Sequence, residues 1–315
     1  MPQITPTPVN TTDSNTEHTD TAIAKFDTPE PISVAAELGV GDIRIVAGDR
    51  SDTIVEVRPS NPERKGDVTA ARQTRVEYDD GRLLITAPKT WKRYTWWGGG
   101  DSIDVRIELP AGSHVRGETG MGALRSVGRI GDCRFKTGMG EIQIEAAGPA
   151  WLRTGMGDII VDSVVGRAEI TTGSGALQVS RIDGAGVIKN SNGDTWVGEA
   201  TGDLQVNAAN GKISVDRAHV TVAAKTANGD VRLGEVSRGA IQAATALGKI
   251  EIGISGGAAV WLDLNTRFGT VRNSLDSADP PQHGEESVEV RARSSCGDIT
   301  VRRTPSSAPA GEDTR

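Results

Sequence analysis

A glycine returns every 17 to 19 residues through the middle of this chain. The eight copies are Gly122, Gly140, Gly157, Gly175, Gly193, Gly211, Gly229 and Gly248. In most copies, apolar residues stand two and four positions after the glycine. A period in this range, sustained over so many copies, predicts the stacked coils of a solenoid instead of a single globular core.

The neighbours of that glycine fall into rows with different roles. Thr stands three positions before it in most copies, for example Thr137 and Thr226. Apolar pairs such as Ile142 with Ile144 have a spacing of two, which places both members on one face of a strand. A weaker glycine lies midway between copies, so each coil contains two short strands joined by two tight turns. The sequence therefore predicts an all-β fold: a single-stranded, β-helix-like β-solenoid with coils of about 18 residues and an inward ladder of Thr hydroxyls.

Two further rows predict contacts between neighbouring coils. Asn192, Asn210 and Asn228 occupy the same position in three successive coils, and stacking would align their amides as a ladder. The position directly after the glycine alternates in charge along four coils, which carry Asp194, Lys212, Asp230 and Lys249. In-register stacking would place each of these charges beside its opposite on an exposed face.

Composition marks polar segments at both ends of a single repeat domain. Residues 1–24 are rich in Thr and lack an aliphatic run, and residues 304–315 are similar, so both are expected to be disordered tails. The β-solenoid is expected over residues 25–303. Within it, residues 113–303 read as regular coils, whereas residues 25–112 are less periodic and are expected to form wider coils that start and cap the solenoid.

Candidate catalytic and metal-ligating residues are few. The four histidines are scattered, and no Ser/His/Asp or Cys/His set follows from their spacing. Asp158, Asp194 and Asp230 lie on one outer row, but successive members are two coils, or about 10 Å, apart. Calcium needs several oxygen ligands, and the slot two residues after the glycine mostly holds Ile, Leu or Val. We therefore expect no enzyme activity, no cofactor and no metal site.

Charge argues against a nucleic-acid partner. The chain carries 35 Lys and Arg against 42 Asp and Glu, a formal net charge of −7, whereas a nucleic-acid-binding domain normally presents a basic face. One outer row does contain four cations, which are Lys136, Arg153, Lys189 and Lys225. Thr171 and Asn207 interrupt this row, and we interpret it as a solvated face.

One segment in the less periodic part departs from a plain scaffold. It holds three of the chain's six Trp, is followed by three glycines, and contains Trp91, Arg93, Tyr94, Trp96 and Trp97. In one interpretation, these rings fold over the open end of the solenoid and cap it. In the other, they form an interaction loop that offers stacking and cation–π contacts to a sugar, an anionic lipid head group or a partner protein.

Cysteine usage and the lack of targeting segments indicate a location. Cys133 and Cys296 fall in coils that stacking separates, so they cannot form a disulfide bond within one chain. We interpret both as small buried hydrophobic residues. The sequence shows no secretory signal and no apolar run long enough to span a membrane. The expectation is a cytoplasmic protein, with surface association left open.

Three stretches of the chain resemble a known family. They are the Gly-Asp-Ile-x-Ile opening at Gly41, the Ile-x-Val-x-Ile-x-Leu-Pro-x-Gly run from Ile103 to Gly112, and the repeated Thr-Gly-x-Gly-x-Ile-x-Ile units. Over about residues 26–303, the chain is similar to the bacterial β-strand-repeat family of adhesin-like proteins, a domain of unknown function. The resemblance implies a β-solenoid scaffold, and the family has no agreed catalytic or binding residues to carry across.

These observations favour a non-catalytic β-solenoid scaffold or interaction protein, adhesin-like by family resemblance. Its expected partner is a protein, and the sequence leaves a carbohydrate or a membrane surface open as alternatives. The alternative function is that of a carbohydrate-binding or carbohydrate-active β-helix protein that uses the segment from Trp91 to Trp97.

Overall fold

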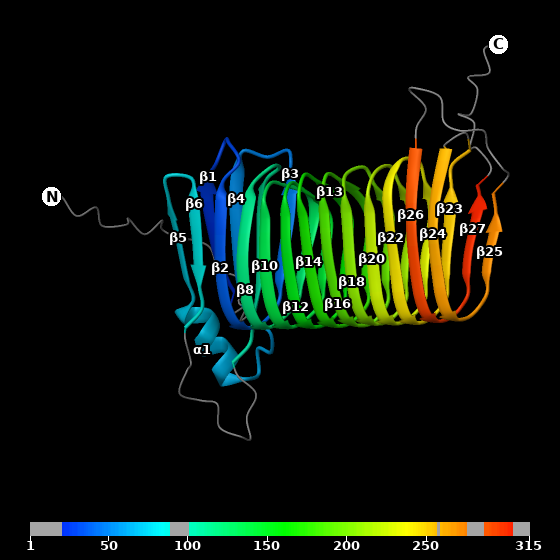
Figure 1. Ribbon diagram of the computed structural model, residues 1–315. Coiled ribbons are helices and arrows are strands. Elements are labelled where there is room, and N and C mark those ends of the chain that lie inside the picture. The colour runs from blue at the N-terminus through cyan, green and yellow to red at the C-terminus, as the bar shows by residue number, and fades with distance from the viewer. Residues whose placement is uncertain (1–20, 89–100, 257–258, 276–286, 305–315) are drawn as a thin grey trace, which may run out of the picture.

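The computed structural model describes residues 21–88, 101–256, 259–275 and 287–304. Over these residues, the chain forms a β-solenoid whose strands lie in two long sheets with one apolar core between them (Figure 1). One sheet has 14 strands and the other has 13, and most neighbouring strands are parallel. The all-β solenoid predicted from the glycine repeat is confirmed.

Regular coils begin at β8 and contribute one strand to each sheet. In the 13-stranded sheet these strands are β8 (His114–Met121), β10 (Cys133–Met139), β12 (Ala150–Met156), β14 (Ala168–Ser174), β16 (Gly186–Asn192), β18 (Leu204–Asn210), β20 (Val222–Asn228) and β22 (Gly239–Leu247). Their counterparts in the 14-stranded sheet are β9 (Leu124–Ile130), β11 (Ile142–Ala147), β13 (Ile159–Val165), β15 (Leu177–Asp183), β17 (Thr195–Ala200), β19 (Ile213–Ala218), β21 (Val231–Val236) and β23 (Ile250–Ile254). Neighbouring strands are in register, so Thr137 stands beside both Thr119 and Thr154.

Alternate side chains of the strands in the regular coils fill the space between the two sheets. The aliphatic pair Ile142 and Ile144 is 0% and 1% exposed, and Val231 and Leu233 repeat this burial several coils later. Each fully buried aliphatic side chain stabilises the fold by about 1.5–3 kcal/mol relative to an exposed one. The core is therefore a thin column of small aliphatic groups, which explains how a chain with 3% aromatic residues can fold.

The repeat glycines form the corner at which the chain passes from the 13-stranded to the 14-stranded sheet. Gly211 has a φ of 132°, and a Cβ atom there would lie 2.1 Å from the carbonyl oxygen of Gly193 in the preceding coil. Gly229 meets the same two constraints against Gly211. Only glycine satisfies both the backbone conformation and the close approach, which is why the repeat is so strict.

A ladder of buried polar side chains lies just inside this corner. Thr226 is 7% exposed, and its hydroxyl donates a hydrogen bond of 3.3 Å to the carbonyl of Gly211 in the preceding coil. Thr172 donates in the same way to Gly157 over 3.1 Å. The predicted inward Thr ladder is confirmed, and its main acceptors are the corner carbonyls.

The Asn residues outside the corner form the predicted amide ladder. Nδ2 of Asn210 donates to Oδ1 of Asn192 over 2.9 Å, and Nδ2 of Asn228 donates to Oδ1 of Asn210 over 2.8 Å. In-register stacking brings identical amides to hydrogen-bond distance, so each rung is matched to the next.

The N-terminal end differs from the regular coils. Its elements are β1 (Ala22–Asp27), β2 (Ser33–Val40), β3 (Ile43–Gly48), β4 (Asp52–Pro59), α1 (Lys65–Gln73), β5 (Arg75–Asp79), β6 (Arg82–Thr86) and β7 (Ile103–Pro110). The coil of β2 and β3 stacks on β8 and β9, and the coil of β6 and β7 lies on its outer side. Beyond them, β4 pairs antiparallel with β7, β1 with β4, and β5 with β6, and these strands close this end (Figure 1).

Three details correct the expectation of wider starting coils. The outermost strands β4, β1 and β5 are antiparallel caps and not wider parallel coils. The sequence pattern did not predict α1, which is held by Asp67, a buried residue that accepts hydrogen bonds from the backbone of Asn61 and Ser102. The strand β1 begins at Ala22, inside the segment 1–24 that the sequence predicts as the N-terminal tail.

No helix among the described residues is long and apolar enough to cross a membrane.

The C-terminal coils do not stack in chain order. The last elements are β24 (Ala259–Phe268), β25 (Val271–Ser274), β26 (Ser287–Cys296) and β27 (Ile299–Arg303). The coil of β26 and β27 lies directly on β22 and β23, whereas the earlier coil of β24 and β25 lies outside it and forms the end. Thr266 and Ser294 stand side by side in the same corner row, so the repeat pattern fits either order.

Candidate functional site

The aromatic segment predicted as an interaction loop lies outside the described residues. This applies to Trp91, Arg93, Tyr94, Trp96 and Trp97. The strands on either side of the segment, β6 and β7, belong to the outer coil at the N-terminal end. Both interpretations of the segment, as a cap or as a carbohydrate or protein contact, therefore stay predictions.

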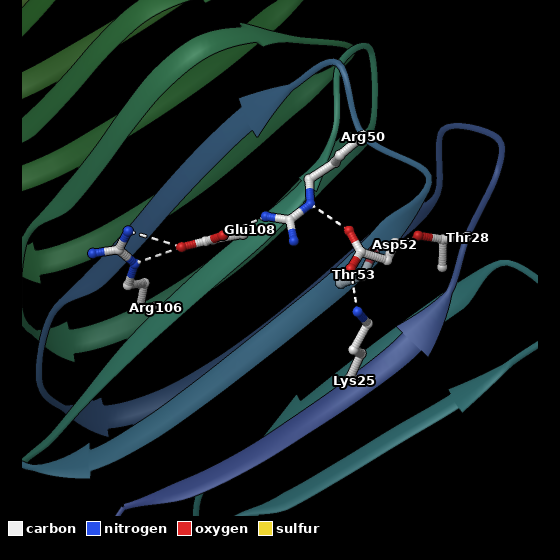
Figure 2. A network of polar contacts seen from close by, with 7 residues as sticks. All are labelled: Lys25, Thr28, Arg50, Asp52, Thr53, Arg106 and Glu108. Atoms are coloured by element: carbon white, nitrogen blue, oxygen red, sulfur yellow. Dashed lines mark hydrogen bonds and ion pairs between the residues drawn. The ribbon is translucent and has the colours of Figure 1, made fainter.

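A network of charged side chains joins β1, β4, β7 and the turn after β3 (Figure 2). Nε of Arg50 donates to Asp52 over 2.7 Å, and Nη1 of Arg50 donates to Glu108. Nζ of Lys25 lies 2.9 Å from Asp52. Nη2 of Arg106 donates to Glu108 over 2.8 Å. Each carboxylate is thus held between two cations that come from different segments.

This network fixes the charge of its acids. Hydrogen bonds from Arg50 and then Lys25 lower the pKa of Asp52 from its usual 3.8 to about 2. Hydrogen bonds from Arg50 and Arg106 likewise lower the pKa of Glu108. A group that stays ionised at neutral pH and is fully paired is a poor proton donor. The network therefore suits the holding of the antiparallel cap strands together, as charge-assisted hydrogen bonds do.

The outer face of the 13-stranded sheet carries a cluster of cations on three adjacent strands. We call it the basic patch, and it consists of Arg116 on β8, Arg134 and Lys136 on β10, and Trp151 and Arg153 on β12. Register places Arg134 between Arg116 and Trp151. The guanidinium carbon of Arg134 lies 4.4 Å from the ring centroid of Trp151, which is a cation–π contact. The patch is therefore a basic and aromatic surface in which Arg134 and Trp151 restrain each other.

Within the described residues, one carboxylate lies within ion-pair distance of the basic patch, that of Glu118, 2.7 Å from Nζ of Lys136. The patch spans two strand spacings, or about 10 Å. Beyond it, the same row continues through Thr171, Lys189, Asn207 and Lys225. The cations there stand two strands apart, so we keep the interpretation of a solvated face for that part alone.

The acidic row after the corner glycine is bound to the backbone. The carboxylate of Asp194 accepts a hydrogen bond of 2.8 Å from the backbone N–H of Lys212 in the next coil. Asp158 and Asp230 accept equivalent bonds of 2.7 and 2.8 Å. The alternating charges stand on adjacent coils as predicted, and each acid accepts its hydrogen bond from the backbone N–H of the residue after the corner glycine of the next coil. These three acids form the carboxylate row considered for catalysis in the sequence analysis, and backbone hydrogen bonds hold all three.

One histidine–carboxylate pair lies on the 14-stranded sheet. Nε2 of His219 lies 2.8 Å from Glu199, and Nη1 of Arg181 donates to the same carboxylate over 2.6 Å. The hydrogen bond from His219 is the main cause that lowers the pKa of Glu199, and the charges of Arg181 and Arg217 add to it. In the part of the chain that the structure describes, no group of three or more His, Cys, Asp or Glu side chains could hold a metal ion. Arg181, Arg217 and His219 thus surround the Glu199 carboxylate on this sheet.

The two cysteines lie in different environments, which corrects one expectation. Cys133 is fully buried, and burial raises the pKa of its thiol to about 12. Cys296 is exposed, contrary to the expectation of a buried hydrophobic residue. It occupies the outward row directly before a corner glycine, where Met139 and Asn210 are exposed as well. The mixed polarity of that row is the sequence signal that could have indicated the exposure of Cys296.

That outward row runs along the corner of the solenoid. We call it the corner ridge, and in spatial order it contains Val40, Met121, Met139, Met156, Ser174, Asn192, Asn210, Asn228, Leu247, Cys296 and Phe268. Its middle is the Asn ladder, and both of its ends carry apolar or sulfur-containing side chains. Met156 and Phe268 are 54% and 68% exposed. The sequence analysis assigned a role, the amide ladder, to the three Asn of this row alone.

The Toastrack DUF4097 family model matches residues 31–302 of the chain. Among curated proteins, no relative matches. Several solved structures are similar to the chain at low identity. A candidate cell adhesion protein of Clostridium sporogenes is 14% identical, with 90% of this chain and 100% of that chain covered and a TM-score of 0.23.

Two further similar structures come from Parabacteroides distasonis and Bacteroides fragilis. A candidate lipid binding protein of Parabacteroides distasonis is 12% identical, covers 90% of this chain and 97% of that chain, and has a TM-score of 0.39. A candidate adhesin of Bacteroides fragilis is 11% identical, covers 89% and 96%, and has a TM-score of 0.29. Identities and TM-scores this low show nothing about what the chain binds. The family match spans nearly the whole solenoid.

Proposed function

The chain belongs to the Toastrack DUF4097 family, and on that premise we propose that it is a non-catalytic β-solenoid scaffold that binds an acidic protein. The proposed contact surface is the basic patch on the 13-stranded sheet. The observation that carries the proposal is the in-register cluster of Arg116, Arg134, Lys136 and Arg153 around Trp151, with Glu118 as the one paired acid among the described residues.

The composition of the basic patch suits a protein contact. Arg and Trp are enriched at the energetic centres of protein interfaces, because their large flat groups combine apolar area with hydrogen bonds. The cation–π contact restrains Arg134 and Trp151 before binding, so less side-chain entropy is lost when a partner covers them. Strand pairing on both sides makes the backbone beneath the patch rigid.

Charge supports an acidic protein over a nucleic acid as the partner. The chain has a formal net charge of −7, so the patch is a local positive region on a negative molecule. A polyanion would meet the surrounding negative charge along its length, whereas a compact acidic surface would meet the roughly 10 Å patch alone. Complementary charge of this kind mainly raises the association rate and selects the partner.

The non-catalytic part of the proposal is supported by the state of the candidate acids. Asp158, Asp194 and Asp230 each accept a backbone hydrogen bond from the next coil, and the acids of the cap network are ion-paired. Inward positions of the coils hold aliphatic and Thr side chains. A scaffold needs only this rigid frame and an outer contact surface.

Charge reversal tests the proposal. The double variant Arg116→Glu and Arg153→Glu reverses two cations of the patch, and a double variant of Arg125→Glu and Arg232→Glu changes the same charge on the 14-stranded sheet. Proteins that copurify with the wild-type chain from its native cells are identified, and an acidic candidate is then purified and titrated directly. We expect binding by the wild type and the control, weakening with salt, and at least about tenfold loss in the patch variant. Equal binding by both variants would contradict the proposal.

A cytoplasmic location is part of the same proposal. Cys133 and Cys296 are both free thiols, as is usual in a reducing compartment. Fractionation of native cells, followed by detection of the chain in cytosolic, membrane and exported fractions, tests this point. Recovery from the exported fraction would contradict it.

A further inference from the structure

Three methionines stand side by side at one end of the corner ridge. Register aligns Met139 with Met121 on one side and with Met156 on the other. Their side chains are 41%, 48% and 54% exposed in the order Met121, Met139, Met156. The chain has four Met in total, and the fourth is Met1. Every internal methionine therefore lies in this one exposed row.

Packing does not account for these side chains. The same ridge position in the following coils holds Ser174, Asn192 and Asn210, so the fold tolerates polar residues there. Each methionine lies between two glycines in sequence, as in Gly138-Met139-Gly140. No neighbouring side chain along the strand therefore hinders the thioethers, and methionine has three rotatable bonds through which its sulfur can move.

We propose that Met121, Met139 and Met156 form a binding site for a soft monovalent cation, Cu(I) in chemical class, through their thioether sulfurs. Thioethers are soft ligands that select Cu(I) over harder divalent ions. Its proposed ligands are thioethers and include no His, Cys, Asp or Glu side chain. It is separate from the basic patch and goes beyond the scaffold function.

The spacing of the coils fits this chemistry. Neighbouring parallel strands lie about 4.8 Å apart. A cation between two adjacent strands is within reach of both flexible thioether side chains. Adjacent thioethers of the row can therefore share an ion. Met121 and Met156 are two spacings apart, about 10 Å, so the central Met139 must take part in every such pair.

Acidic residues lie on the corner beside the ridge. Glu141 and Asp158 each follow two residues after a ridge methionine, on adjacent coils. The Asp158 carboxylate is held there by its hydrogen bond with the backbone N–H of Ala176. Glu141 lies 3.9 Å from Arg125. The Asp158 carboxylate therefore supplies the negative charge at this corner, and it favours a cation bound by neutral thioethers.

Ag(I), which has the same softness and does not change oxidation state, is the probe for the first experiment. The chain is labelled with ¹³C at the methionine methyl groups, in a Cys296→Ser background that removes the exposed thiol as a competing ligand. We expect one equivalent of Ag(I) to shift the methyl signals of Met121, Met139 and Met156 and to leave that of Met1 unchanged. Unshifted ridge signals would overturn the proposal.

Single Leu variants of the three ridge methionines then test the geometry, because Leu keeps the apolar volume and removes the sulfur. Cu(I) affinity is measured in reducing buffer by competition with a chromophoric chelator. Met139→Leu is expected to weaken binding about tenfold and more than either Met121→Leu or Met156→Leu, since the two outer variants keep an adjacent pair. Thermal unfolding of each variant confirms that it is folded. Weakening by an outer variant that equals or exceeds that of Met139→Leu would overturn the site.

Discussion

Asn190 makes the hydrogen bond that Ala208, its neighbour in the next coil, cannot make. In the regular coils, the residue at this row donates to the corner carbonyl of the preceding coil, so residue 208 would serve Gly193. Nδ2 of Asn190 instead donates to Gly193 over 2.9 Å while it also donates to Gly175 over 3.1 Å. Oδ1 of Asn190 is buried and has no hydrogen-bond partner among the described residues. One longer side chain thus serves two coils at the expense of an orphan acceptor.

This relationship predicts a coupling between the two positions. Asn190→Thr keeps the bond to Gly175 but leaves the carbonyl of Gly193 without a donor, so we expect a loss of about 1 kcal/mol in the free energy of unfolding. Adding Ala208→Thr supplies the donor to Gly193 and restores the regular ladder, and Asn190→Thr has already removed the orphan oxygen. The double variant is therefore expected to be at least as stable as the wild type. Denaturant unfolding of both single variants and the double variant measures the coupling. Additive effects would show that the two residues act independently.

The corner glycines predict a severe effect from one added methyl group. Gly211→Ala places a Cβ atom 2.1 Å from the carbonyl of Gly193 and at a φ that L-residues avoid, so we expect the free energy of unfolding to fall by about 3 kcal/mol or more. Gly39→Ala is the control, because no atom lies within 4 Å of the added Cβ, and it is expected to change stability by about 0.5 kcal/mol or less. Similar unfolding midpoints for the two variants would argue against the tight corner.

The regular coils were predictable because each constraint recurs at a fixed offset. Gly211, Thr226 and Ile213 represent three rows whose roles follow from spacing alone, and all three rows behave as predicted. The order of the last two coils was not predictable, because Thr266 and Ser294 fit the same row in either arrangement. The antiparallel caps and α1 depend on contacts at one end that no repeat specifies.

The features of the candidate site were also predictable only where they follow the repeat. The cation row through Lys136 and Arg153 was visible in the sequence, but its concentration into a patch depends on Arg116, Arg134 and Trp151 on neighbouring strands of the sheet. Paired charges such as those of Arg50 and Asp52 are local, whereas the pairing of Arg50 with Glu108 joins segments 58 residues apart. Spacing within a repeat cannot predict contacts of that kind.

The cap network predicts a loss of stability in acid. The pKa of Asp52 is about 2 in the folded chain and close to 3.8 otherwise, so its pairing stabilises the fold above about pH 4. This contribution declines as the pH falls through the range between those two values. We expect the denaturation midpoint of the wild type to fall more steeply from about pH 5 to 2 than that of Asp52→Asn. Parallel pH profiles for the two proteins would contradict the assigned pairing. Lys25→Met is expected to flatten the pH profile less than Asp52→Asn does, because Arg50 remains and is the stronger partner of Asp52.

The two thiols are expected to react at very different rates. Burial raises the pKa of Cys133 to about 12, so almost no thiolate forms and no reagent reaches it, whereas Cys296 is exposed. A chromogenic thiol reagent is expected to modify one thiol per folded chain and two per chain in denaturant, and Cys296→Ser is expected to abolish the folded-state reaction. Two rapid equivalents in the folded chain would place Cys133 in solvent.

The basic patch as a contact surface is tested most directly by crosslinking in native cells. A photoreactive amino acid replaces Lys136 in the patch or, in a matched control, Gln178 on the outer face of the 14-stranded sheet, and both positions are exposed. Irradiated adducts are separated by size and identified by mass spectrometry. The account predicts a discrete adduct with an acidic protein from position 136 and none from position 178. Adducts of equal yield from both positions, or from position 178 alone, would contradict it.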